Sequence, residues 1–324
     1  MPGFRTHYVF GIESRNTLKK IHTPESLSIW DMVRSHPGAY AIGQQGPDIF
    51  FYNPMSYAHK RNTGEWMHHE NTLDFICNLI KVSESVNNAD LRAIAHAYTA
   101  GFIGHYTLDT SCHPYIHFRT CKNINDHSNR GFYNHMFLET DIDVAMTAHF
   151  LKLRPSEFSP SATIHLTREE AVFLSAVIQR AITMTYHESV VLSPEVTSAF
   201  RFTRIVYDLM EDKNKWKKKL VRSLEDDFLH HPQFSAMIAD DDQTTYTDPC
   251  NLRHLEWQNP WDTSIHWTES FYDLFRKAEK QYIRRLYLFF RVLSSDFGSR
   301  DYYAYELNLE KELGNLSYDS GLTL

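Results

Sequence analysis

The sequence predicts a mainly α-helical protein. Apolar residues recur near helical spacing in several long segments, and no series of alternating apolar and polar residues indicates strands. No fixed-period repeat is present. We therefore expect a multi-helix bundle that carries the functional site over residues 1–190. A C-terminal helical extension, residues 191–324, is expected to follow and can pack on the same core.

Start and stop signals divide the first half of the chain. Thr23 precedes Pro24, a pair that caps and opens a short helix, whereas residues 1–60 are otherwise mixed in character. Turn residues at 43–48 exclude a helix interior there. Asp90 is expected to cap the helix that Pro114 ends or bends. The other predicted elements are a helix over 65–86, a polar loop over 119–130 and a helix over 133–151.

The second half is also predicted to be helical. Thr167 and Glu170 have the spacing of a capping box and open a helix that runs toward His187. Ser193 and Pro194 precede the next helical stretch. The remaining expectations are a long helix over 195–238, a polar loop over 239–251, a strong helix over 266–295 and a weakly patterned tail from residue 297.

Composition limits the classes of function. The 324 residues are 42% hydrophobic, which suffices for a substantial core, and carry a formal net charge of -7. A weakly acidic chain has no general electrostatic attraction for nucleic acid or anionic lipid. Any phosphate group must therefore be attracted locally, by a metal ion or a basic pocket.

Cysteine usage and hydropathy indicate the compartment. The four cysteines form no CxxC pair, so reduced thiols are expected rather than a disulfide framework. The first residues contain no secretory-type apolar run, and no segment approaches the ~20 apolar residues of a membrane span. The sequence as given therefore predicts a cytoplasmic location.

Histidine is unusually frequent, with 19 residues concentrated in the first half. His105 and Asp109 are four positions apart on one predicted helix, and His135 and Glu139 have the same spacing on the next. Residues at i and i+4 share a helix face, so the two pairs can converge in a bundle. Imidazole and carboxylate are ligands that zinc accepts readily.

A single histidine–carboxylate pair is weak as a metal signal, because surface helices carry such pairs by chance. Two features strengthen it here. The second pair follows after one loop, and the first lies on the apolar stripe of its helix beside Phe102 and Tyr106. A buried carboxylate is costly unless it is paired or bound to a metal.

The local sequence resembles the zinc-dependent phospholipase C family, which is similar in fold to single-strand nucleases. Gly101–Asp109 reads GFIGHYTLD, followed by Cys112-His113-Pro114 and then His135-x3-Glu139. Three earlier segments also resemble the family, over about residues 1–150 in all: His7-Tyr8, Gly46-Pro47-Asp48 and Met67-His68. The resemblance implies an all-α phospholipase C-like or nuclease-like bundle.

The resemblance implies two or three zinc ions. The implied first site is Asp48, His68, His105 and Asp109, and the second is His113, His135 and Glu139. His69 is an alternative to His68, and His117 is an alternative to His113.

A third ion would be held by His7 and a chain-terminal amino group, with Asp109 bridging. The secreted members of the family begin with a tryptophan whose amino group binds zinc, whereas this chain begins Met1-Pro2-Gly3. The third site would therefore be completed by water or by another side chain such as His22, or be absent.

The resemblance further implies zinc-dependent hydrolysis of a phosphodiester, with Asp48 as the catalytic base. The sequence contains no GxSxG elbow, P-loop or GxGxxG motif, which agrees with attack by a zinc-activated water. A phospholipid is the expected substrate, with transient membrane-surface contact and no stable nucleic-acid partner. The alternatives are a single-strand nuclease and a non-catalytic, zinc-stabilised helical binding domain.

Overall fold

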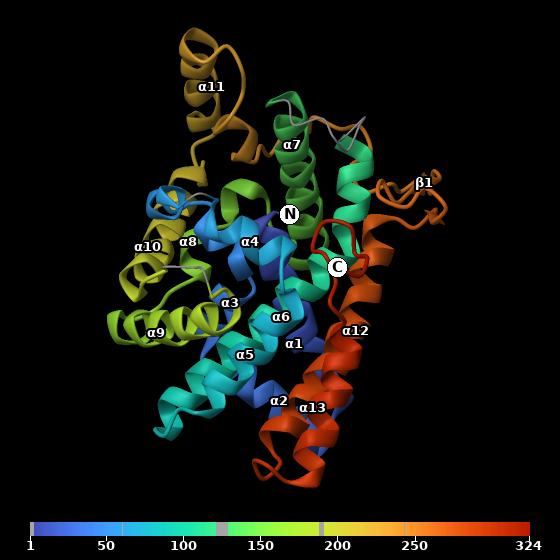
Figure 1. Cartoon of the computed structure of the whole chain (residues 1–324). Helices are drawn as coiled ribbons and strands as arrows, with labels where there is room; N and C mark the ends of the chain where they lie inside the picture. Colours follow the sequence, from blue (N-terminus) through green and yellow to red (C-terminus); the bar gives the residue numbers. More distant parts are fainter. Residues whose placement is uncertain (1–2, 60, 121–128, 188–190, 243) are drawn as a thin grey trace.

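The computed structural model describes residues 3–59, 61–120, 129–187, 191–242 and 244–324. The all-α fold class is confirmed, with α6 (Ala89–Thr120) as the central helix and α12 (Phe271–Leu293) packed along it (Figure 1). Around them lie α1 (Phe4–Ile21), α2 (Pro24–Ser35), α3 (Pro37–Gly43), α4 (Thr63–His69), α5 (Thr72–Glu84), α7 (Asn129–Met146), α8 (Pro160–Thr163), α9 (Arg168–Thr185), α10 (Ser193–Met210), α11 (Lys217–Phe228) and α13 (Arg300–Leu313).

Short elements connect these helices. The 3₁₀ turns are η1 (Gly46–Phe50), η2 (Pro54–Ala58), η4 (Pro155–Glu157) and η5 (Ser235–Met237), and the π-turn η3 (Thr147–Leu151) extends α7. The strands β1 (Trp257–Gln258) and β2 (His266–Trp267) form an antiparallel pair in which Trp257 opposes Trp267.

Two predicted helix starts are confirmed in atomic detail. The Thr23 hydroxyl accepts from the Ser26 amide, with Pro24 in the first turn of α2. The Thr167 hydroxyl accepts from the Glu170 amide, and the Glu170 carboxylate accepts from the Thr167 amide. Each cap satisfies amide groups that a helix start leaves without an intrahelical partner.

Helix α1 was not predicted, because the group that caps it is distant in sequence. No side chain at Gly3 caps its first turn. Instead the Asp143 carboxylate, from α7, accepts from the Arg5 amide at 3.1 Å and from the Thr6 amide at 2.8 Å. The Thr6 hydroxyl also donates to it at 2.6 Å. A carboxylate is favourable at the positive end of a helix dipole.

Replacing Asp143 by alanine is expected to lower the free energy of unfolding by about 1–3 kcal/mol, because buried amides would lose a charged acceptor. Urea unfolding measures the change. The matched control is Asp90→Ala, which removes an exposed acid from α6. Equal effects of the two substitutions would show that Asp143 does not cap α1.

The predicted single helix over 65–86 is wrong: the structure has α4 and α5, separated at Glu70 and Asn71. Asn71 adopts a left-handed conformation with φ of 49°, which asparagine tolerates better than most residues. The cap of the next helix, α6, was also assigned two residues too late. The Asn88 side chain, not that of Asp90, accepts from the Leu91 amide at 3.0 Å.

Pro114 does not end its helix, since α6 continues to Thr120. Proline has no amide hydrogen, so the Thr110 carbonyl loses its usual helical donor. The predicted polar loop at 119–130 lies mostly outside the described residues. The expected helix over 133–151 corresponds to α7 followed by η3.

The predictions for the second half were wrong in two places. The stretch 195–238 is divided into α10, α11 and η5 rather than forming one helix. The strands β1 and β2, too short to give an alternating pattern, occupy the region before α12, whose own cap is Ser270. The tail contains α13, which packs on α12.

One buried cluster of apolar side chains contains residues from both 1–190 and 191–324. The division at residue 190 stays a prediction. The described helices include none with the length and apolar character needed to cross a membrane.

Candidate metal centre

Four segments bring histidines and carboxylates together in the interior. His7 comes from α1, Asp48 from η1, His68 from α4, and both His105 and Asp109 from α6. All five side chains are buried, with at most 4% of their surface exposed. Their polar atoms form two overlapping groups that could hold a metal ion: His7, His105 and Asp109, and Asp48, His68 and His105.

The Asp109 carboxylate lies at the middle of this cluster. Its Oδ1 is 3.1 Å from His7 Nε2, and its Oδ2 is 3.0 Å from His105 Nε2. His68 Nε2 lies 3.2 Å from Asp48 Oδ1 and 3.8 Å from the second oxygen of Asp109. The i,i+4 prediction for His105 and Asp109 therefore describes their placement on one face of α6.

The backbone fixes the orientation of two imidazoles. His105 Nδ1 lies 3.1 Å from the Gln44 carbonyl and His68 Nδ1 lies 2.6 Å from the Gly64 carbonyl. A carbonyl only accepts, so each Nδ1 carries the proton and, in the neutral ring, each Nε2 presents a lone pair. A hydrogen bond from Nδ1 to a carbonyl is typical of histidines that bind metals through Nε2.

At the centre of the cluster, Nε2 atoms with lone pairs therefore face carboxylate oxygens, which also carry lone pairs. The structure gives no hydrogen-bond partner to several buried atoms, namely Nδ1 and Nε2 of His7, Oδ1 of Asp48, Nε2 of His68, Nε2 of His105 and both oxygens of Asp109. Unpaired buried polar atoms are rare in native proteins, and each requires an explanation. Cations placed among them would satisfy those of these atoms that face the centre of the cluster.

The pKa shifts of the buried carboxyl groups also indicate that the cluster favours a positive charge. Burial alone would raise the pKa of Asp109, but the neighbouring His105, His113 and His7 hold it well below its usual range. Burial, together with the negative charges of Asp48 and Asp109, raises the pKa of Glu139 well above its usual value. Several carboxylates thus compete for little positive charge in a buried site.

A second group adjoins the first on α6 and α7. His113 Nε2 lies 3.7 Å from Asp109 Oδ1, and His135 Nε2 lies 2.7 Å from Glu139 Oε1. The ring centroids of His117 and His135 are 5.0 Å apart, and those of His113 and His135 are 6.1 Å apart. The structure therefore brings both His113 and His117 to this group and does not choose between them.

Burial prepares His113 to act as a ligand. It lowers the pKa of this residue to about 4, so the ring is neutral near pH 7. Metal ions bind neutral imidazole, so no proton must be displaced first. Both ring nitrogens of His113 are buried without a hydrogen-bond partner.

The neighbours His68 and His69 have different positions. His68 lies within the first group, whereas His69 is partly exposed at its margin. His69 Nδ1 lies 2.8 Å from the Glu65 carbonyl, and its Nε2 lies 2.8 Å from the Asp319 carboxylate. Both partners are acceptors, and the bond to Asp319 raises the pKa of His69.

Asp319 is the residue that sequence reasoning missed. It groups with His113 and His117, and these three residues could also hold a metal ion. It lies in the weakly patterned tail, about 200 residues from these histidines, and no local motif marks it. The preceding residue, Tyr318, packs its ring against that of His68, and the ring centroids are 4.7 Å apart.

His22 does not complete a third site. It is the exposed, left-handed C-cap of α1, fifteen positions beyond His7, or about 22 Å along the helix axis. The chain-terminal amino group expected beside His7 belongs to Met1, which lies outside the described residues.

A small cavity of about 30 Å³ opens beside the cluster, with Asp48 and Glu139 in its lining. The rest of the lining is mixed. Thr140 and Asp143 are polar, and the apolar side chains are Phe4, Tyr52, Met136, Met210 and Met237. The cavity gives the two carboxylates access to a small molecule such as water.

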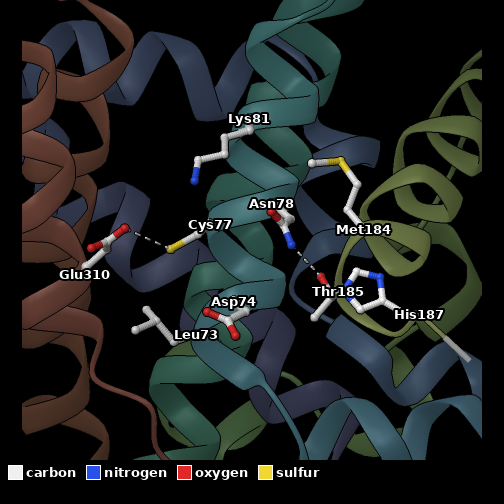
Figure 2. Close-up of a pocket in the computed structure, with 9 residues that line it drawn as sticks. All are labelled: Leu73, Asp74, Cys77, Asn78, Lys81, Met184, Thr185, His187 and Glu310. Atoms are coloured by element: carbon white, nitrogen blue, oxygen red, sulfur yellow. Dashed lines mark hydrogen bonds between the residues drawn. The ribbon is translucent and has the colours of Figure 1, made fainter. Parts of the chain in front are cut away.

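A different pocket, of about 250 Å³, is separate from the cluster (Figure 2). It lies where α5, α9 and α13 meet, and hydrogen bonds cross it from Cys77 to Glu310 and from Asn78 to Thr185. Its lining includes Asp74, Cys77, His187 and Glu310, but none of them belongs to the groups of possible metal ligands found among the described residues.

The fold and the cluster define an all-α protein with buried groups of nitrogen and oxygen atoms, presented from several helices, that could hold a metal ion. The chain belongs to the zinc-dependent phospholipase C family, whose model matches residues 6–188, more than half of the chain. No curated protein and no solved structure matches it. The family supports zinc as the metal and phosphoric-ester hydrolysis as the class of reaction.

Proposed function

We propose that the protein hydrolyses a phosphodiester of a phospholipid, or of a related phosphate ester, in a phospholipase C-type reaction at the histidine–carboxylate cluster. The observation that carries the proposal is the set of buried nitrogen and oxygen atoms that face one another without hydrogen-bond partners around Asp109. Their chemistry fits zinc, which takes imidazole and carboxylate ligands at about 2 Å.

The proposed ligands follow the two groups in the structure. Asp48, His68, His105 and Asp109 would hold one ion. A second would be held by His135 and Glu139 with His113 or His117. His7 lies 3.1 Å from Asp109, which supports a third ion bridged by that carboxylate.

When bound, closely spaced zinc ions neutralise phosphate charge and lower the pKa of a bound water toward ~7. Asp48 is the proposed base, because its carboxylate both touches His68 and lines the small cavity. There it can orient the attacking water and accept its proton. The backbone carbonyls of Gln44 and Gly64 keep the imidazoles of His105 and His68 turned toward the metal site.

Two observations support a lipid ester as the substrate. The cavity beside Asp48 has an apolar side, formed by three methionines, Phe4 and Tyr52, which faces its acidic residues. The net charge of -7 gives no basic path for a nucleic-acid chain. Transient contact with a membrane surface is part of the proposal, and the cytoplasmic location stays a prediction.

The zinc-loaded protein is expected to release phosphorylated head group from mixed phospholipid vesicles and to leave single-stranded DNA intact. Asp48→Asn should lower the rate about 100-fold or more, because a base in the transition state contributes at least that much. Chromatography of the released phosphorylated head group measures the products. The matched control is His96→Gln, which replaces a histidine paired with Glu84 outside the cluster.

Other results would redirect the assignment. Cleavage of single-stranded DNA without cleavage of lipid would indicate a nuclease of similar fold. Tight zinc binding without hydrolysis of any phosphodiester, including an activated aryl ester, would indicate a zinc-stabilised binding domain and contradict the proposed activity.

A further inference from the structure

The last eleven residues, 314–324, pack against the helices, and we call them the C-terminal segment. Ser317, Tyr318 and Ser320 are buried in it, whereas Thr323 and Leu324 are exposed. Figure 1 shows it returning from α13 to the middle of the molecule, close to α6. The segment begins at Gly314, with φ of 65°, and an isolated bridge joins Leu316 to Thr323. It lies more than 120 residues beyond the part of the chain that the family model matches.

The start of the segment is anchored by two buried side chains. Arg285, fully buried in α12, donates to the Glu312 carbonyl at 3.0 Å and to the Leu313 carbonyl at 3.1 Å. The Tyr106 hydroxyl donates to the Gly314 carbonyl at 2.6 Å. The same hydroxyl accepts from the Leu316 amide at 3.0 Å. Tyr106 is next to His105, so the segment is tied to the helix that carries the cluster.

The rest of the segment is held close to the cluster. The Tyr318 amide donates to the His68 carbonyl at 3.3 Å, and the Asn259 side chain donates to the Ser320 carbonyl at 2.8 Å. Gly321 has φ of 64°, and a Cβ there would lie 2.3 Å from the Thr110 carbonyl. That carbonyl is the one that Pro114 leaves without its helical donor. A side chain at position 321 would collide with α6, so glycine permits this close approach.

These anchors place the Asp319 carboxylate between three histidines. One oxygen, Oδ2, lies 2.8 Å from His69 Nε2. The other, Oδ1, lies 3.4 Å from His113 Nδ1 and 3.5 Å from His117 Nε2. A carboxylate that is oriented through one oxygen and presents the other to imidazole nitrogens has the arrangement of an oriented metal ligand.

We propose that Asp319 is a zinc ligand supplied by the C-terminal segment, completing a site with His113 and His117. The proposal rests on the proposed function insofar as that function places zinc in the neighbouring cluster. His69 is the positioning residue, since it fixes the carboxylate without reaching the first group of ligands. Metal binding and docking of the segment are then coupled, because the ion joins α6 to the end of the chain.

The direct test is a zinc titration against a chromophoric chelator, using the wild-type protein, Asp319→Asn and Asp109→Ala. Asparagine keeps the shape of Asp319 but removes its charge. Asp319→Asn is expected to bind one ion fewer, or to bind that ion about 100-fold more weakly. The matched control is Asp301→Asn, an exposed acid of α13, which should titrate as the wild type does.

The outcomes separate the two proposals. If Asp109→Ala loses zinc while Asp319→Asn titrates as the wild type does, Asp319 is not a ligand and the proposed function stands. If the wild type binds no zinc, both fail.

A second measurement needs no variant and so does not depend on a substitution that folds. Hydrogen–deuterium exchange of the unaltered protein, with zinc and with a chelator, reports on the amides of residues 315–322. The coupling predicts slower exchange in these amides when zinc is bound. Equal exchange in the two conditions would overturn the role of Asp319 as a ligand.

Discussion

The Asp109→Asn protein is expected to lose most of its zinc and to hydrolyse phosphodiesters about 1000-fold more slowly than the wild type. Asp109 is fully buried and lies within 4 Å of four histidines of the cluster: His7, His68, His105 and His113. Asparagine has nearly the same shape but carries no charge, and its amide hydrogens repel a cation. Metal ions contribute several kcal/mol to a phosphoryl transition state, and each 1.36 kcal/mol is a factor of about ten in rate.

The control for this prediction is Asp90→Asn. It makes the same chemical change on the same helix at an exposed position, and both zinc content and rate should be unaltered. Circular dichroism shows whether each variant keeps its helices. A folded Asp109→Asn protein with wild-type zinc and wild-type rate would contradict the assignment of the cluster.

Removal of zinc is expected to lower the stability of the wild-type protein substantially. Without a cation, the carboxylates of Asp48, Asp109 and Glu139 lie buried near one another. A ligand at one hundred times its dissociation constant stabilises the folded state by about 2.7 kcal/mol per site. For a chain of this size, that is a rise in melting temperature of about 5 °C for each ion.

Thermal unfolding followed by circular dichroism, with zinc and with a chelator, measures this difference. Magnesium is the control, because it prefers octahedral oxygen sites and should leave the melting temperature unchanged. The zinc response should be smaller in Asp109→Asn. An identical melting temperature with zinc and with chelator would show that the cluster is stable without a metal.

What the sequence could predict here depended on local spacing. The four-residue separations of His105 from Asp109 and of His135 from Glu139 place each pair on one helix face, and the structure has both arrangements. The caps at Thr23 and Thr167 are likewise local. Contacts within one or two helical turns follow from helix geometry alone.

Other features were missed because their causes are distant in sequence. Helix α1 begins where Asp143, about 140 residues away, accepts its first amides. The tail from residue 297 gave no strong pattern, yet it forms α13 and carries Asp319 to the histidines of α6. The break at Asn71 depends on a left-handed backbone conformation. It separates His68 in α4 from the helix that follows.

The proposed function depends on zinc binding by the buried histidines and carboxylates. Elemental analysis of protein purified without chelator tests it most directly, with Asp109→Ala and His135→Ala measured beside the wild type. We expect two or three zinc ions per wild-type chain, and fewer in both variants. Less than about one zinc per chain, unchanged by either substitution, would contradict it.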